Sequence, residues 1–155
     1  MTSRCGRVEW GNGGILIARM NRLEFQSLAA ERLYDAVALL QAGRYACAYY
    51  IAGYAIECAL KACIARKTKQ DDFPPKDAAK YYVHDIPKLL DIAGLASAFT
   101  QEANQDPTFR ANWAVVKDWS EESRYQSRGQ QQAQEILDAI NDPQHGVLRW
   151  LKRNW

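Results

Sequence analysis

One carboxylate lies in a segment that contains little else that is charged. Glu57 is in the middle of residues 45–65, a run of small and apolar residues whose only basic member is Lys61. Burying a carboxylate in such a segment is costly unless it is paired or hydrogen-bonded. Lys61 lies four positions further on, a spacing at which helical side chains meet. Arg124, beside Tyr125, is the other candidate partner, because it lies in a junction between two predicted helices, and we rank it first.

Two interpretations of Glu57 follow. In the structural one, it ties the helices together through an ion pair or simply reaches solvent, since structural ion pairs are common among buried carboxylates. In the functional one, it belongs to a polar pocket beside the central helix, with Tyr50 or Tyr54 as walls.

The chain has only two histidines, His84 and His145. His84 stands next to Asp85 at the expected start of a helix, where capping or packing is its simplest role, and it is also a candidate site residue. The sequence contains no GxxxxGK[ST] phosphate loop, HExxH, paired CxxC or nucleophile elbow. We therefore predict no metal site, no cofactor and no catalytic residue of a familiar type.

Composition restricts the class of protein. The 155 residues suggest one domain, and 48% hydrophobic residues are enough for a core. The net charge of +2 is too small to indicate nucleic acid or a membrane by itself. The four cysteines lack disulfide or zinc spacing, which favours a reducing compartment, and we expect a cytoplasmic protein. Residues 45–65 are long enough to span a membrane, but Glu57, Lys61 and the tyrosines oppose that interpretation.

Apolar residues repeat at helical spacing from Asn21 onward, and no strand pattern follows residue 20. Gly43 lies where a left-handed helix end is needed, so the first two helices are expected to form an antiparallel hairpin. Capping residues predict further helices that begin after Asp85, after Asp106 and after the Asn141-Asp142-Pro143 segment. Helices are expected over residues 21–41, 45–65, 86–93, 95–104, 107–119 and 130–140, with a last one near the C-terminus.

The predicted fold class is therefore all-α, a helical bundle formed by residues 21–155. Residues 1–20 are a poorly determined extension in which residues 7–10 and 15–18 either pair as a hairpin or form an unstructured lead. Residues 67–75, with the pair Pro74-Pro75, are expected to form a loop that is either mobile or lines a site.

The central segment also resembles a known family. The run from Gly43 to Ala62, GRYACAYYIAGYAIECALKA, is similar to the signature of the HEPN domain family, and His84-Asp85 and Arg124-Tyr125 follow in the expected order. The resemblance covers about residue 21 to the C-terminus. It implies an up-and-down bundle of four to five main helices with short extra helices, usually dimeric. Many members act beside a minimal nucleotidyltransferase or in toxin–antitoxin pairs, and others are metal-independent endoribonucleases.

The sequence departs from the ribonuclease members in one respect. Those members carry an arginine followed by four to six residues and a histidine, and neither His84 nor His145 has an arginine at that spacing. Our first hypothesis is thus a non-catalytic homodimer that binds a nucleotide or a nucleotidyltransferase partner. The second is a divergent ribonuclease that uses His84 with Arg124 or Arg110 on RNA, which we do not favour. The third is a dimeric interaction module without a ligand.

Overall fold

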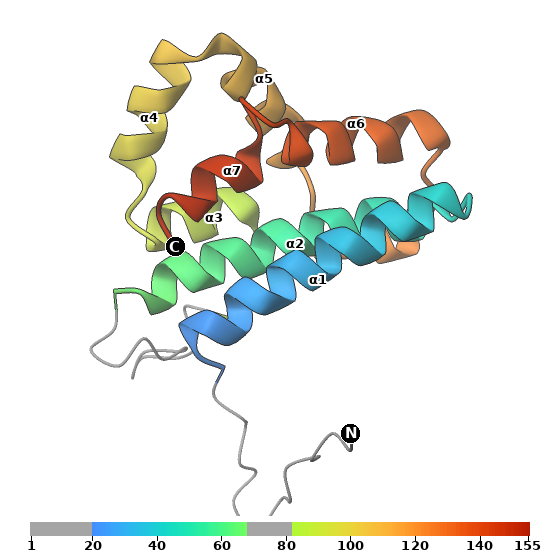
Figure 1. The fold of residues 1–155 in the computed structure, drawn as a ribbon, viewed down its shortest axis with the longest axis horizontal. Coiled ribbons are helices and arrows are strands. Elements are labelled where there is room, and N and C mark those ends of the chain that lie inside the picture. Colours follow the sequence, from blue (N-terminus) through green and yellow to red (C-terminus); the bar gives the residue numbers. More distant parts are fainter. Residues whose placement is uncertain (1–19, 68–81) are drawn as a thin grey trace, which may run out of the picture.

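A computed structural model of the chain describes residues 20–67 and 82–155, and its first two helices form a long hairpin. Helix α1 spans Arg22–Gln41 and α2 spans Tyr45–Ala65. Figure 1 shows them side by side and antiparallel. Asn21 and Glu24 form a capping box at the start of α1. Gly43, with φ of +73°, makes the tight turn, because the left-handed conformation is unfavourable for residues with a Cβ.

Helix α2 is the central element of the core. Its alanine stripe is completely buried and lets neighbouring helices approach closely: Ala48, Ala52, Ala55, Ala59 and Ala62. By length and composition α2 could cross a membrane, but 78% of its most apolar window is buried inside the protein. That burial is what the core helix of a soluble protein requires, and the predicted helix of residues 45–65 is confirmed.

The remaining helices are short: α3 (Ile86–Ile92), α4 (Ala96–Gln105), α5 (Pro107–Val116), the 3₁₀-helix η2 (Glu121–Tyr125), α6 (Gln130–Asn141) and α7 (Val147–Lys152). Helices α3, η2, α6 and α7 pack on the hairpin, whereas α4 and α5 pack on one another and α5 packs on α6 and α7. Asp85 and Asp106 cap α3 and α5 through the backbone N–H groups of Lys88 and Phe109, as predicted. The described residues form helices without any strand, which confirms the all-α fold class.

A second layer of packing lies above the hairpin in Figure 1. Helix α6 packs along α2 and also on α1, whereas α3 and α7 lie on α2 nearer its C-terminal end. Phe99, Phe109, Trp113 and Trp150 form an aromatic cluster between α4, α5 and α7, with ring centroids 5.0–6.2 Å apart. The tryptophans in this cluster are core residues.

The start of the last helix was predicted wrongly. The Asn141-Asp142-Pro143 segment does not begin a helix; α7 begins at Val147 with Gly146 as its N-cap. The Asp142 carboxylate instead accepts hydrogen bonds from the backbone N–H groups of Gln144 and His145, which closes a turn. The expected hairpin or lead at the N-terminus and most of the loop predicted for residues 67–75 lie outside the described residues.

Candidate functional site

Glu57 is buried, with 1% of its surface exposed, and it is paired with two basic side chains. The Nζ atom of Lys61, one helical turn further on, lies 2.6 Å from its Oε1 atom. The Nδ1 atom of His84 lies 3.0 Å from both of its carboxylate oxygens. Glu57 and Lys61 project from the side of α2 that faces the segment before α3, so the cost of burying the carboxylate is offset by two charge-assisted hydrogen bonds.

His84 extends this network to a third element. The side chain is 39% exposed, and its Nε2 atom lies 3.2 Å from Oε2 of Glu121, the first residue of η2. The imidazole therefore lies between a buried carboxylate on α2 and a half-exposed carboxylate on η2. Because the two carboxylates contact different nitrogens of the ring, they do not converge on one point. In residues 20–67 and 82–155, no group of three His, Cys, Asp or Glu side chains could hold a metal ion.

Arg124 and Tyr125 lie at the other end of the same short helix. The guanidinium of Arg124 stands 4.8 Å from the centroid of the Tyr125 ring. Hydrogen bonds to Tyr125 and, less strongly, to Tyr50 of α2 raise the pKa of Arg124, which stays charged at any physiological pH. Tyr125 is 79% exposed. A cation and an aromatic ring are thus both presented to solvent beside the charged network.

Tyr50 and Tyr54 connect the two halves of this face along α2. Their ring centroids are 6.2 Å apart. Burial raises the pKa of the Tyr54 hydroxyl, and the negative charge of the neighbouring Glu57 contributes to the shift. Tyr54 therefore remains a neutral phenol at neutral pH, able to donate or accept a hydrogen bond.

Trp119 holds η2 against α2. Its indole is buried and stacks on Tyr50 with ring centroids 5.9 Å apart. A Cβ built on Gly53 would come within 2.2 Å of the indole ring, so the glycine is what allows the ring to lie on the helix backbone. Trp119 thereby fixes the segment that carries Arg124.

All six predicted site residues lie on one face, which we call the polar face: Tyr54, Glu57 and Lys61 of α2, His84, and Arg124 and Tyr125 of η2. The expected first partner of Glu57 was wrong, because Lys61 and His84 contact this carboxylate and Arg124 contacts tyrosines. Arg124 is on the tip of η2, whereas Glu121, one turn earlier, is the residue of η2 that faces the network.

Glu121 is a member of the polar face that the sequence did not identify. It is one of two adjacent acidic residues in an exposed polar stretch, and nothing in the sequence distinguishes it from Glu122. Its role becomes visible once Trp119 fixes the orientation of η2.

The second histidine belongs to a different part of the protein. The Nδ1 atom of His145 lies 2.7 Å from Oδ2 of Asp106, and Asn112 donates a hydrogen bond to the backbone oxygen of His145. These contacts join the start of α5 to the turn before α7. Arg110 also belongs to α5, which packs on α4, α6 and α7. Among the histidines, His84 alone is part of the polar face.

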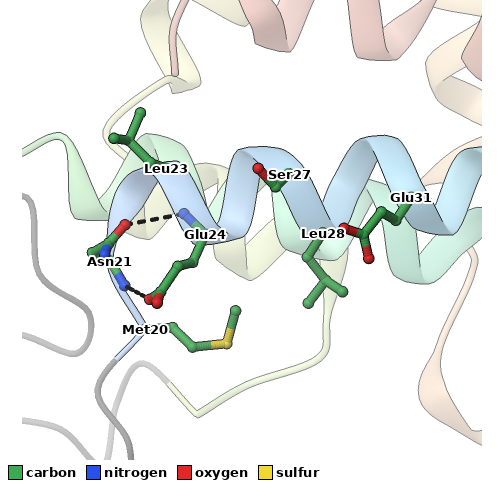
Figure 2. A pocket seen from close by; sticks show the side chains of 7 residues that line it. All are labelled: Met20, Asn21, Leu23, Glu24, Ser27, Leu28 and Glu31. Atoms are coloured by element: carbon green, nitrogen blue, oxygen red, sulfur yellow. Dashed lines mark hydrogen bonds between the residues drawn. The ribbon is translucent and has the colours of Figure 1, made fainter. Parts of the chain in front are cut away.

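A shallow hollow at the start of α1 is shown in Figure 2. It is lined by residues of α1 and by the two residues before this helix, and it contains none of the predicted site residues. Two of its polar side chains form the capping box, in which the Asn21 side chain accepts from the Glu24 N–H and the Glu24 carboxylate accepts from the Asn21 N–H.

Comparison with known proteins gives one match. The model of the HEPN domain matches residues 25–154, which is nearly the whole of the described helical region. No curated protein and no solved structure matches the chain. The match includes every residue of the polar face.

Proposed function

The chain belongs to the HEPN domain family, and from this we propose that it is a non-catalytic binding protein whose polar face takes a nucleotide. One observation carries the proposal. Both ring nitrogens of His84 are occupied by carboxylates, whereas the adjacent Arg124 and Tyr125 are exposed. A guanidinium is well suited to phosphate, and an exposed tyrosine is suited to stacking on a base. The histidine that a nuclease would use is thus engaged, and the groups that recognise a nucleotide are accessible.

A thermal-shift assay with a panel of nucleotides at millimolar concentration tests this proposal. A ligand that binds only the native state raises the melting temperature, and a ligand at about 100 times its Kd adds about 2.7 kcal/mol to stability. We expect a rise for the wild type that is lost in Arg124→Ala and reduced in Tyr125→Ala. Arg110→Ala, which removes an exposed arginine of α5, is the matched control and should keep the rise. No shift with any nucleotide would favour an interaction module without a ligand.

The partner in this proposal is a second copy of the chain, alone or together with a minimal nucleotidyltransferase in a toxin–antitoxin context. Helix α1 supports the homodimer, because Leu23 (65% exposed) and Tyr34 (78% exposed) lie on the same outward side, three turns apart. Two exposed positions on this side, Ser27 and Ala30, carry no charge, and the exposed Glu24 and Glu31 lie beside it. Light scattering after size-exclusion chromatography should give a dimer for the wild type and a monomer for Tyr34→Glu. A dimer that survives this change would place the interface elsewhere.

A divergent endoribonuclease is the second candidate, and one observation favours it. The buried carboxylate of Glu57 accepts from Nδ1 of His84, so the Nε2 atom points toward η2, the helix that carries Arg124. A carboxylate that orients a histidine in this way is a feature of general acid–base sites. Displacement of Glu121 would free Nε2 to take a proton from a ribose hydroxyl. Cleavage of RNA on a gel, lost in both His84→Ala and Arg124→Ala but kept in Arg110→Ala, would establish this function and reject the first.

We also propose a cytoplasmic location. The cysteines of the described ranges, Cys47, Cys58 and Cys63, are all free thiols, and free thiols persist in reducing compartments. Fractionation of cells that express a tagged chain checks this proposal. Recovery with the membrane or secreted fraction would contradict it.

A further inference from the structure

Two carboxylates lie at the two nitrogens of the His84 ring. Nδ1 lies 3.0 Å from both oxygens of Glu57 and is hydrogen-bonded to this carboxylate. Nε2 lies 3.2 Å from Oε2 of Glu121, in an ion-pair contact between two partly exposed side chains. A carboxylate attracts an imidazolium, whereas the lone pair of a neutral ring nitrogen turned toward a carboxylate is repelled. The contact with Glu121 therefore favours the protonated form of His84.

The two contacts of His84 differ in their dependence on its charge. In a neutral His84 that keeps its N–H toward Glu57, the other ring nitrogen would turn a lone pair toward Glu121. Because Glu57 is buried and Glu121 is half-exposed, the contact to Glu121 is the one that water can replace when the second proton leaves.

Three other charged residues of the described ranges near the network, Arg32, Asp85 and Arg124, have partners of their own. On α1, Arg32 pairs with Asp35. Next to His84, the Asp85 carboxylate accepts the backbone N–H of Lys88 at the start of α3. On η2, Arg124 contacts Tyr125 and Tyr50.

The contact to Glu121 fixes the position of a short element. Helix η2 has five residues, and a 3₁₀-helix of this length depends on tertiary contacts because its own hydrogen bonds are poor. Two side chains hold its N-terminal end in place. The indole of Trp119, two positions earlier, packs on α2, and the carboxylate of Glu121 contacts His84, which in turn contacts Glu57 of α2. The other end carries Arg124 and Tyr125. Loss of the Glu121 contact therefore loosens the segment that presents them.

We propose that His84 is a proton-dependent clasp between α2 and η2. When protonated, it donates a hydrogen bond to Glu57 and attracts Glu121 by its charge, which keeps η2, and with it Arg124, beside Tyr50. When neutral, it keeps the N–H that faces Glu57 and releases Glu121. Histidine exchanges its second proton in the physiological range, around pH 6.5 for the free side chain. The clasp itself is independent of any ligand; control of nucleotide binding by the clasp rests on the function proposed above.

The test uses His145→Gln, in which His84 is the only histidine of the chain. The protein is labelled with ¹⁵N-histidine and 5-fluorotryptophan, and Trp119→Phe assigns the fluorine resonance of Trp119. We expect both ring nitrogens to be protonated at the acidic end of the titration and one to lose its proton as the pH rises. The Trp119 resonance should shift with the same midpoint. A ring that titrates while the Trp119 resonance stays constant would overturn the clasp.

Glu121→Gln, made in the same background, is the second arm. A carboxamide can donate or accept, so it can contact either form of the imidazole. The histidine should still titrate, but the shift of Trp119 should fall at least about threefold, since the contact no longer depends on the second proton. An undiminished shift in Glu121→Gln would also overturn the clasp.

Nucleotide titrations at the same pH values separate the two proposals. In the wild type, affinity should fall as His84 loses its proton, whereas in Glu121→Gln it should change much less with pH. If no nucleotide binds at any pH, the proposed function is rejected. The clasp is not affected by that result, because the fluorine titration measures it without a ligand. Nucleotide affinity that is independent of pH in the wild type counts against control by the clasp.

Discussion

The imidazole of His84 lies 3.0 Å from the buried carboxylate of Glu57, although 27 positions separate the two residues in the chain. This contact connects the segment before α3 to the middle of α2. Together with Lys61, it explains how a carboxylate is tolerated among the alanines of the central helix. It also makes Glu57 the most sensitive polar residue of the fold.

Replacement of Glu57 should strongly destabilise the protein. In Glu57→Ala the buried amine of Lys61 loses the carboxylate that it contacts, and breaking a buried pair from one side costs about 3–5 kcal/mol. Urea unfolding followed by circular dichroism measures the change. Glu31→Ala, at an exposed position of α1, is the control and should stay within about 0.5 kcal/mol of the wild type.

A companion variant identifies the cause. Glu57→Gln combined with Lys61→Met removes both charges of the α2 pair while it roughly preserves their volume. We expect this double variant to be more stable than Glu57→Ala, because no uncompensated amine remains in the core. If the two variants unfold at the same urea concentration, the loss comes from packing and not from charge.

Gly53→Ala should destabilise the protein even though alanine is the better helix former. In an unstrained helix the change gains up to about 1 kcal/mol. Here the new Cβ would lie 2.2–2.3 Å from atoms of the Trp119 indole, which is buried and cannot move without losing its contact with α2. The expected net result is a lower melting temperature and a displaced η2.

The same substitution in a Trp119→Leu background is the control for this prediction. With the indole removed, Gly53→Ala should be neutral or stabilising, so the double-mutant cycle should show a clear coupling between the two positions. Equal effects of Gly53→Ala in both backgrounds would mean that the glycine is needed for another reason.

The contact between His145 and Asp106 should stabilise the fold within a limited range of pH. The hydrogen bond between the two side chains raises the pKa of His145 and lowers the pKa of Asp106. For the histidine, the contribution is complete below about pH 6.5, its unfolded value, and is lost as the pH rises through the higher folded value. For the aspartate, it is complete above about pH 3.8 and is lost as the pH falls through the lower folded value.

The difference in stability between the wild type and His145→Gln should therefore be largest at about pH 4–6.5 and should shrink toward higher pH. Comparison of the two proteins at each pH cancels the titration of groups elsewhere, including His84. Asp106→Asn keeps a side chain that can cap α5 but removes the charge. In the Asp106→Asn background, the loss of stability caused by His145→Gln should no longer be largest at about pH 4–6.5. If it still is, His145 interacts with another group.

The fold was predictable from the sequence because its signals are local. The alanine stripe of α2, the left-handed Gly43 and the caps Asp85 and Asp106 act within a few residues, and each appears in the structure as expected. The exception was Asp142, where the same capping chemistry closes a turn four residues before the helix. A capping residue followed by proline occurs both at the start of a helix and in a turn, so the local sequence alone does not distinguish the two.

The polar face was only partly predictable, because its pairing depends on tertiary geometry. The burial of Glu57 and its pairing with Lys61 follow from helical spacing. Its contact with His84 does not, since it depends on how the segment before α3 crosses α2. Arg124 was on the correct face but with the wrong partner, because the orientation of η2 is set by Trp119 on Gly53. The spacing of apolar residues in the sequence does not predict the contact between Trp119 and Gly53.

The cysteines should differ sharply in reactivity. Burial raises the pKa of Cys58 and of Cys63 to about 12, so both remain protonated thiols at neutral pH and react slowly. Cys47 is exposed at the start of α2. In a Cys5→Ser variant, a colorimetric thiol reagent at about pH 8 should therefore modify one thiol in the native protein and three in urea. Cys47→Ser added to this variant should abolish the native reaction. Rapid labelling of two or three thiols without urea would mean that the α2 core opens on the timescale of the assay.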